Sequence, residues 1–228
     1  MMAEPMPPAP LTFGRVSLAR VRRCEGWLAA RYLHPRERAL AAALTVDKRR
    51  VDFIAGRIAA RRALTQLGVS PSACVLPEAA GAAAGAPRVQ DDAATPVALS
   101  IAHGGGWAVA VAARGCRVGV DIEAVEPRHA SFAAEAFAAG ELDGWSRALG
   151  RAAADAQVVT VAWCVKEALL KLAECGLRAP LPAMVPTRID LQHNCIYTQE
   201  LGVSRLALAV DAARALAVVW STKEEEGS

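Results

Sequence analysis

The chain has 228 residues, which suits one large domain or two small ones built around a shared core. Hydrophobic residues make up 54% of the chain, so a substantial core is expected, and the formal net charge of +3 is too small to indicate nucleic-acid binding. The start lacks a secretory signal, and no apolar run reaches the roughly 18 residues of a membrane span. The six cysteines lack the spacing of a zinc site, so free thiols are expected. These features predict a cytoplasmic protein that binds neither nucleic acid nor a membrane.

The first part of the sequence reads as a strand followed by helices. Branched and aromatic residues predict a strand over residues 11–21, and helical patterns follow over residues 36–44 and 47–68. Asp47 is expected to cap the longer helix and Gly68 to end it.

The rest of the sequence alternates between strands and helices. Residues 75–96 contain Gly and Pro and read as a loop with room for a short strand. Strands follow over residues 96–103, 107–113 and 116–123, and the turns GGG and RG between them predict an antiparallel meander. Further on, we expect helices over residues 132–145 and 158–176, with Gly176 as the end of the second, and strands over residues 188–192, 204–211 and 215–221.

This order of elements predicts an α+β fold. Strand, helices and strands are followed by helices and strands again, so we expect two similar α/β halves with mainly antiparallel sheets and packed helices. The expected parts are a disordered start (1–10), an N-terminal half (11–116), a C-terminal half (117–222) and an acidic tail (223–228).

The segment VGVDIE, residues 118–123, places two carboxylates in an apolar strand. Because side chains alternate along a strand, Gly119, Asp121 and Glu123 share one face. Positions two apart lie roughly 7 Å from each other, so both carboxylates can converge on one ion, and Gly119 is expected to leave room for a ligand. Two oxygen donors without a nearby His or Cys favour Mg²⁺ over zinc. An acidic strand end at the surface is the alternative interpretation.

A second acidic element is WCVKEALLK, which is predicted to be helical. Trp163, Glu167 and Lys171 are each four residues apart and therefore share one helical face. Glu167 and Lys171 have the favourable order of a helical ion pair, which is usually part of a solvated face. In this apolar neighbourhood a third carboxylate could complete an Mg²⁺ site, and Lys171 could face a phosphate.

Basic residues supply two further candidate features. Arg50, Arg57 and Arg61 form a stripe on one helical face, which is typical either of phosphate binding or of an ordinary solvated face. The segment SIAHGGGW places His103 at a strand end beside a glycine turn, which suits the binding of an anion. The HGGG motif also occurs in lipases and esterases, but the chain lacks their G-x-S-x-G nucleophile elbow.

VGVDIE followed by WCVKEALLK resembles the paired signature of the Sfp-type 4′-phosphopantetheinyl transferases. KRRVDFIAGRIAAR is similar to the basic helix of that family, and LSIAHGGGWAVAVAA to its histidine segment, so four blocks occur in the family's order. The resemblance implies the family's pseudo-two-fold fold, with both halves in one monomeric chain. It also implies an enzyme dependent on Mg²⁺, with Mn²⁺ as an alternative. Such an enzyme transfers the 4′-phosphopantetheine arm of coenzyme A to a serine of an apo acyl or peptidyl carrier protein and releases adenosine 3′,5′-bisphosphate.

The resemblance also implies a role for each matching residue. Asp121, Glu123 and Glu167 match the Mg²⁺-binding acids. Glu167 also matches the base that takes the proton of the carrier serine, and Lys171 matches a catalytic lysine at the pyrophosphate. The residues implied to contact coenzyme A are Arg49, Arg57, Arg88, His103, Lys166 and Lys171.

Some positions depart from the family pattern. Ala102 stands where many relatives have Ser or Thr before the histidine, and Arg88 is the candidate to replace a lysine of some relatives. Helical spacing aligns Arg50 with Arg57, whereas the resemblance favours Arg49. A non-catalytic module that binds coenzyme A or a carrier protein is the alternative from a different functional class, although such a module would not need three acids.

Overall fold

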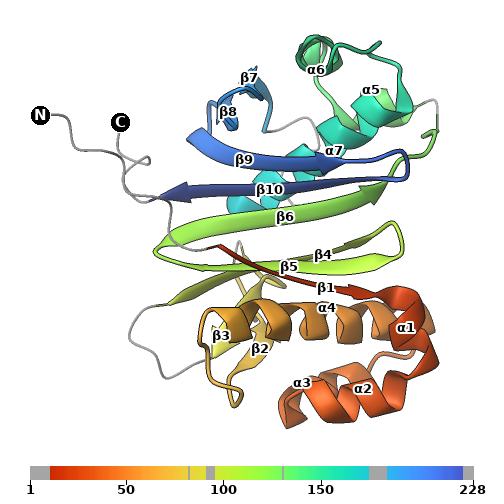
Figure 1. Ribbon diagram of the computed structural model, residues 1–228, viewed down its shortest axis with the longest axis vertical. Coiled ribbons are helices and arrows are strands. Elements are labelled where there is room, and N and C mark those ends of the chain that lie inside the picture. Colours follow the sequence, from red (N-terminus) through yellow and green to blue (C-terminus); the bar gives the residue numbers. More distant parts are fainter. Residues whose placement is uncertain (1–10, 82, 91–95, 130, 175–183, 223–228) are drawn as a thin grey trace, which may run out of the picture.

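The computed structural model of the protein describes residues 11–81, 83–90, 96–129, 131–174 and 184–222 (Figure 1). The expected disordered start, the expected helix end at Gly176 and the acidic tail lie outside these residues. The first half contains β1 (Thr12–Ser17), α1 (Leu18–Arg23), α2 (Glu25–Tyr32), α3 (Pro35–Ala42), α4 (Asp47–Gln66), β2 (Cys74–Pro77), β3 (Pro87–Gln90), β4 (Val97–Gly104) and β5 (Trp107–Arg114). The second half contains β6 (Cys116–Ala124), α5 (Phe132–Ala136), α6 (Glu141–Leu149), α7 (Ala156–Leu172), β7 (Pro186–Asp190), β8 (Cys195–Thr198), β9 (Gly202–Val210) and β10 (Arg214–Thr222).

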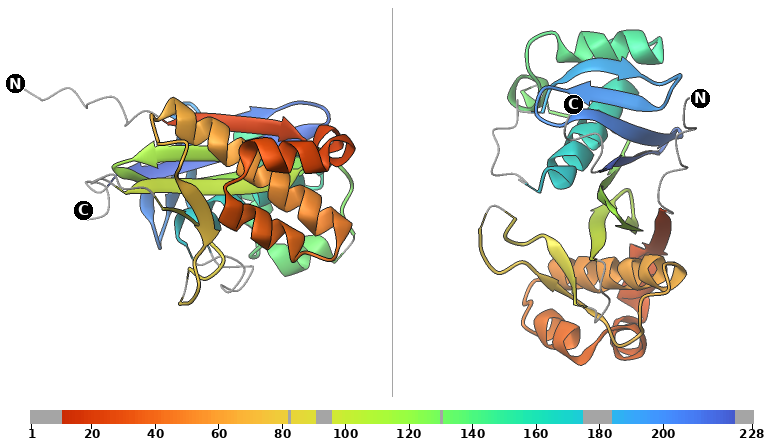
Figure 2. Two further views of the ribbon diagram at one scale, coloured as in Figure 1. Left: turned by 90° about the horizontal axis from the view of Figure 1, so that it is seen from below. Right: turned by 90° about the vertical axis from the view of Figure 1, so that its left-hand side faces the viewer.

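The strands of the described residues form two main antiparallel sheets that meet where β6 lies beside β4 and β5 (Figures 1 and 2). One sheet has the order β1-β5-β4 and the other the order β6-β10-β9-β8-β7, while β2 and β3 form a separate hairpin. Helix α4 covers the outer face of the first sheet, and α7 covers the outer face of the second. The mixed helical and antiparallel architecture confirms the predicted fold class.

The core is divided into three clusters because each central strand turns alternate side chains to opposite faces. Every second residue of β5 packs towards α4, and the residues between them pack against β6 and β10 of the other sheet. The alanines and Val219 on the other face of β10 pack against α7. The two faces of β5 are Ala108, Ala110 and Ala112 towards α4, and Val109, Val111 and Ala113 towards the second sheet.

Each half repeats one order of elements: a strand, helices that end with the longest helix, a hairpin and two further strands. The closest contact between strand and helix is also repeated. A Cβ added to Gly14 of β1 would lie 2.0 Å from the carbonyl oxygen of Ala59 in α4. A Cβ added to Gly119 of β6 would lie 1.9 Å from the carbonyl oxygen of Ala168 in α7.

A second contact is repeated at equivalent positions. Arg62 at the end of α4 donates a hydrogen bond to the carbonyl oxygen of Arg15, and Lys171 at the end of α7 donates to that of Val120. The strand residues of the two contacts in the second half follow their counterparts in the first half by the same number of positions. The same holds for the helix residues, with a different number. Helix α4 therefore lies on β1 as α7 lies on β6, which supports the expectation of two similar halves residue by residue.

The observed elements differ from the predicted ones mainly at turns. The strand expected over residues 11–21 ends at Ser17, where α1 begins, and the loop expected over residues 75–96 contains the hairpin of β2 and β3. The helix expected over residues 132–145 is divided into α5 and α6, because the backbone is extended at Phe137 and left-handed at Gly140, which has a φ of 76°. Asp47 is the first residue of α4 rather than its cap.

The predicted meander is wrong at its third strand. β4 and β5 pair as expected, but β6 pairs with β10 in the other sheet. The apolar face of β6 packs across the interface between the sheets instead of extending the first sheet. The cause is the internal repeat, because β6 is the first strand of the second half and takes the place that β1 has in the first.

The helices and the cysteines of the described residues agree with what the composition predicts. None of their helices has the length and apolar character needed to cross a bilayer. Their cysteines are free thiols, and all except Cys24 are buried. Cys175 lies outside the described residues.

Candidate active site

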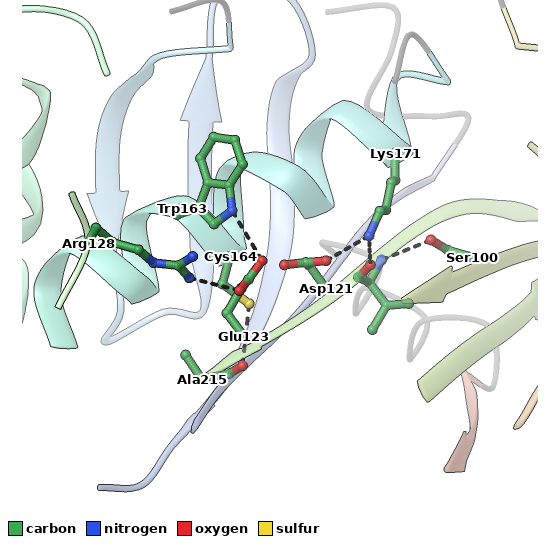
Figure 3. A network of polar contacts seen from close by, with 9 residues as sticks. Ser100, Asp121, Glu123, Arg128, Trp163, Cys164, Lys171 and Ala215 are labelled. Carbon is green, nitrogen blue, oxygen red and sulfur yellow. Dashed lines mark hydrogen bonds and ion pairs between the residues drawn. The ribbon is translucent and has the colours of Figure 1, made fainter. Parts of the chain in front are cut away.

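The candidate site lies where β4 and β6, edge strands of the two sheets, approach each other. The backbone N–H of Val120 in β6 donates to Oγ of Ser100 in β4 at 3.1 Å (Figure 3). Gly104 allows the strands to approach further on, since a Cβ there would lie 1.8 Å from the carbonyl oxygen of Ile122. The strand that carries the two acids is thus held directly against the other half.

Asp121 and Glu123 project from β6 towards α7, on the face that strand alternation predicts (Figure 3). The expectation that Gly119 leaves room for a ligand beside them is wrong. The backbone of α7 fills that space, because a Cβ at Gly119 would clash with the carbonyl of Ala168. The glycine instead brings α7 close enough for its side chains to reach the acids.

Asp121 is buried and forms an ion pair with Lys171. Oδ1 of Asp121 lies 2.7 Å from Nζ of Lys171, and the same ammonium group donates to the carbonyl oxygen of Val120 at 3.1 Å (Figure 3). The other carboxylate oxygen, Oδ2, is buried and has no hydrogen-bond partner among the described residues. An unpaired buried oxygen is energetically costly, and a bound cation would satisfy it.

Glu123 has a different environment, because both of its oxygens accept hydrogen bonds. Nε1 of Trp163 donates to one oxygen at 3.2 Å, and the guanidinium group of Arg128 donates to the other at 2.8 Å (Figure 3). Coordination of a cation by Glu123 would therefore compete with Arg128.

Glu167 lies on the face of α7 that also carries Trp163 and Lys171, and it is half-buried. Burial raises the pKa of Glu167, the charge of Lys171 lowers it, and the charges of Asp121 and Glu123 raise it. The net pKa lies above the ordinary value for glutamate. A carboxylate with a raised pKa is a stronger base once it is ionised.

The three acids face one another across β6 and α7 but do not form a finished metal site. Within the described ranges, no three His, Cys, Asp or Glu side chains are arranged to hold an ion. The carboxylate oxygens and the unpartnered Oδ2 of Asp121 fit Mg²⁺ or Mn²⁺ in their chemistry. Glu123 fits the ion less well, because both of its oxygens already accept hydrogen bonds.

His103 lies at the end of β4, against the middle of α4. A Cβ added to Gly56 of α4 would lie 2.7 Å from Nε2 of the imidazole. Desolvation lowers the pKa of His103, and the charges of Lys171 and Arg57 act in the same direction, while Asp52 opposes them. The residue as a whole is exposed, but Nε2 of its ring lies against α4, which desolvates the imidazole.

A pocket of about 500 Å³ lies between the two halves and extends to Lys171. Apolar residues of β4 and of the segment before β3 form much of its wall, together with the end of α7. Its charged and hydroxyl-bearing lining residues are Arg88, Ser100, Arg117, Lys171 and Glu174. The pocket therefore combines an apolar wall with cationic side chains, one of which, Lys171, pairs with Asp121.

Arg88 borders this pocket, but carboxylates hold its guanidinium group. Two of its nitrogens pair with both oxygens of Glu174 at 2.6 and 2.8 Å, and Nε donates to Glu78 at 3.0 Å. The pair joins β3 of the first half to the end of α7 in the second. A contact between Arg88 and coenzyme A would have to compete with Glu174.

The arginine stripe of α4 mostly anchors the helix to its own half. Arg50 pairs with Glu25 of α2, and Arg57 and Arg61 donate to backbone carbonyls before and within β2. Desolvation lowers the pKa of Arg57. Arg49 is exposed and makes no hydrogen bond or ion pair with the described residues. Of the two neighbouring arginines, Arg49 has the guanidinium group that no other described residue engages.

Lys166 lies in the core of the second half. It is 1% exposed, and its ammonium group pairs with Glu141 of α6 at 2.7 Å and donates to the carbonyl of Ala136 at 3.1 Å. Neighbouring helical residues point about 100° apart, so Lys166 faces α6 while Glu167 faces β6. This placement does not support the expected contact with coenzyme A.

Several residues of the site were not found from the sequence. Arg128 and Glu174 hydrogen-bond to the predicted residues Glu123 and Arg88, and Gly56 lies against His103. Ser100 accepts from the N–H of Val120, next to Asp121. Arg128 lies five residues after Glu123, so its closeness in sequence could have predicted a contact between them. The other three come from elements distant in sequence, and only the fold brings them to the site.

Comparisons with known proteins identify the family. The sequence model described as the 4′-phosphopantetheinyl transferase superfamily matches residues 117–208, and the model of the 4′-phosphopantetheinyl transferase N-terminal domain matches residues 36–113. None of the curated protein sequences compared with the chain matches it.

Similar solved structures include three holo-acyl-carrier-protein synthases. One, from Bacillus anthracis and solved in complex with CoA (3′,5′-ADP), is 25% identical, with a TM-score of 0.41, and the match covers 46% of this chain and 95% of that one. Those from Plasmodium yoelii and Neisseria meningitidis are 17% and 18% identical, with TM-scores of 0.38 and 0.36. These two matches each cover 46% of this chain, and 91% and 95% of the respective structure. The two family models account for both halves, and the chain belongs to the 4′-phosphopantetheinyl transferase superfamily.

Proposed function

We propose that the protein transfers the 4′-phosphopantetheine arm of coenzyme A to a serine of an apo acyl or peptidyl carrier protein. The observation that carries the proposal is the meeting of Asp121, Glu167 and Lys171 across β6 and α7, beside the pocket between the halves. Family membership supports the same reaction.

Coenzyme A would occupy the pocket between the halves, with its pyrophosphate near Lys171. Lys171 is held by Asp121 and by a backbone carbonyl, so its ammonium group is already in position to meet a phosphate oxygen. His103, Arg57 and the unengaged Arg49 are the candidates for contacts at the nucleotide end. Arg88 could contact the nucleotide only if it released Glu174. Lys166 has a structural role, because it is paired with Glu141 in the core.

In the proposed step, the serine oxygen attacks the β-phosphorus of coenzyme A. A bond forms between this oxygen and phosphorus, and the bond from phosphorus to the oxygen bridging the two phosphates breaks. Glu167 takes the serine proton, and adenosine 3′,5′-bisphosphate leaves with the bridging oxygen. Lys171 stabilises negative charge on the phosphates.

Asp121 and Glu167 would hold Mg²⁺, with Glu123 as the third acid if Arg128 gives way. The ion would neutralise phosphate oxygens during the transfer. Since both halves that border the pocket belong to one chain, we infer that the monomer is sufficient for activity.

The direct test incubates purified protein with Mg²⁺, coenzyme A and a panel of apo carrier proteins, and follows the carrier mass. The carrier should gain the mass of the arm, and adenosine 3′,5′-bisphosphate should appear in equal amount. Asp121→Asn and Glu167→Gln should each lower the rate at least about 100-fold, a typical loss for a general base. Glu200→Gln, at an exposed turn, is the matched control and should leave the rate unchanged.

Four outcomes would count against the proposal or a part of it. A carrier panel without any mass gain would remove the transferase reaction, and calorimetric binding of coenzyme A without turnover would favour the non-catalytic module. Full activity of Asp121→Asn or Glu167→Gln would remove the assigned roles. Undiminished activity after metal chelation would remove the Mg²⁺ dependence alone.

A further inference from the structure

Gly56 occupies a position in α4 where glycine is unfavourable unless something requires it. It lies in the middle of a 20-residue helix, where glycine costs about 1 kcal/mol relative to alanine. Its φ is not positive, so the backbone does not require glycine there. The reason must therefore lie in what surrounds the missing side chain.

Two of the three heavy atoms nearest to an added Cβ at Gly56 belong to His103. A Cβ at this position would lie 2.7 Å from Nε2 and 3.3 Å from Cε1 of the imidazole, and 3.0 Å from Cγ2 of Ile101. A contact of 2.7 Å is too short to persist, so the ring would have to move. Because the imidazole is the end of a rotatable side chain, it can move without unfolding the protein.

At Gly56 the imidazole ring of His103 lies within electrostatic reach of charged side chains from both halves. Asp52 lies one helical turn before Gly56, and Arg57 follows it in α4. Lys171 belongs to the other half, yet its charge also acts on the pKa of His103. The ring is therefore within electrostatic reach of the ammonium group that pairs with Asp121.

We infer that Gly56 is a positioning residue, whose missing side chain seats His103 for contact with a phosphate of coenzyme A. The inference rests on the proposed function for the identity of the ligand, but the seating itself does not. Gly56 acts through His103 and touches no reacting atom. Replacing it should displace the imidazole, weaken coenzyme A binding and leave the chemistry of bound substrate largely intact.

The first experiment observes the ring directly. Nitrogen-15 NMR resolves the imidazole groups of the four histidines in the protein. In Gly56→Ala, the His103 resonances should shift while those of His34, His129 and His193 stay in place. Gly26→Ala is the matched control, because Gly26 is also helical and has no atom within 4 Å of an added Cβ. Unchanged His103 resonances in Gly56→Ala would overturn the seating.

The second experiment measures coenzyme A binding by calorimetry, without a carrier protein. Gly56→Ala should weaken binding about 10-fold, since small displacements of binding groups cost 10- to 100-fold, and should raise KM more than it lowers kcat. His103→Ala should cause a similar loss, and the double variant should bind no more weakly than His103→Ala alone. Independent, multiplying losses would show that Gly56 does not act through His103.

Thermal unfolding completes the test. In the His103→Ala background, Gly56→Ala should raise the unfolding midpoint, as a helical glycine replacement does once the ring is gone. In the parent background the rise should be smaller or reversed, and equal effects in both backgrounds would contradict the contact. If the unmodified protein does not bind coenzyme A, the proposed function and the ligand assignment fail together, while the NMR result still decides whether Gly56 seats His103.

Discussion

At the scale of single residues, Gly119 determines how closely α7 can lie against β6. A glycine on the same strand face as two acids predicts space for a ligand beside them. In the structure that space holds the backbone of α7, with the carbonyl of Ala168 and the N–H of Leu172 within 3 Å of an added Cβ. The glycine therefore sets the distance between the acids of β6 and the side chains of α7.

Gly119→Ala should destabilise the protein by about 3 kcal/mol, because neither neighbouring backbone atom can move aside. Urea unfolding followed by circular dichroism measures the change. Gly26→Ala, where an added methyl group meets open space, should be neutral or stabilising by up to about 1 kcal/mol. Equal stabilities for the two variants would contradict the close approach of β6 and α7.

Glu167 should make the metal-free protein less stable at neutral pH. Burial raises its pKa in the folded state, so unfolding favours the ionised form once the pH exceeds the ordinary glutamate value. Glu167→Gln should therefore be more stable than the parent protein above the folded-state pKa. The difference should vanish below the unfolded-state pKa, near 4.3. Denaturant midpoints in chelator across pH 3.5–8 check this, and a less stable variant at pH 8 would contradict the raised pKa.

At the scale of elements, the ion pair between Lys166 and Glu141 fixes α6 against α7. Both side chains are almost fully buried, and the Lys166 ammonium group also lies 5.2 Å from the centre of the Phe137 ring. Lys166 directly precedes Glu167 in sequence, so the pair holds the helix turn that presents the candidate base.

Lys166→Met should destabilise the protein by about 3–5 kcal/mol, because it leaves the Glu141 carboxylate buried without its partner. The double variant Lys166→Met/Glu141→Gln should recover much of this loss, since it removes the buried charge and keeps an acceptor for the N–H of Ala138. Denaturant unfolding of the four proteins forms a double-mutant cycle. Additive losses would mean that the two side chains do not interact.

The sequence predicted well those features that depend on local periodicity. The alternation in VGVDIE placed Asp121 and Glu123 correctly on one face, and four-residue spacing aligned Glu167 with Lys171. It did not reveal where Lys166 points, because residues adjacent in sequence face different neighbours on a helix. The hairpin in residues 75–96 was also missed, since its strands are short and bury few side chains.

Contacts between distant segments had no local signal. The approach of His103 to Gly56 and of Arg88 to Glu174 depends on how the halves and their helices pack. Strand pairing of β6 was likewise decided by the internal repeat, and not by the short turn before it.

At the scale of the whole molecule, the pair of Arg88 and Glu174 links the first half to the end of α7. Arg88 lowers the pKa of Glu174 by hydrogen bonding to it, and burial partly opposes this effect. Both side chains are about 40% exposed, so water screens the pair. We expect a contribution of about 1 kcal/mol.

Glu174→Gln should lower stability at pH 7, since a carboxylate with a depressed folded-state pKa stabilises the fold above its unfolded-state pKa. The stabilisation is lost as the pH falls through the folded-state pKa, so parent and variant should converge in strong acid. Denaturant unfolding at pH 7 and at pH 3 measures both limits, with Glu200→Gln as an exposed control. A gap that widens in acid would reverse the assigned direction of the shift.

The internal repeat also supplies a reference built into the chain. Arg62 makes in the first half the strand contact that Lys171 makes in the second, but the residue equivalent to Asp121 there is the buried Val16. The change in the free energy of unfolding caused by Arg62→Met therefore measures what this contact between helix and strand contributes. Lys171→Met measures the contribution of the same contact together with the loss of the ion pair to Asp121 and of any phosphate binding. The difference between the two variants is therefore what the ion pair and phosphate binding add, in the second half, to a contact that both halves share.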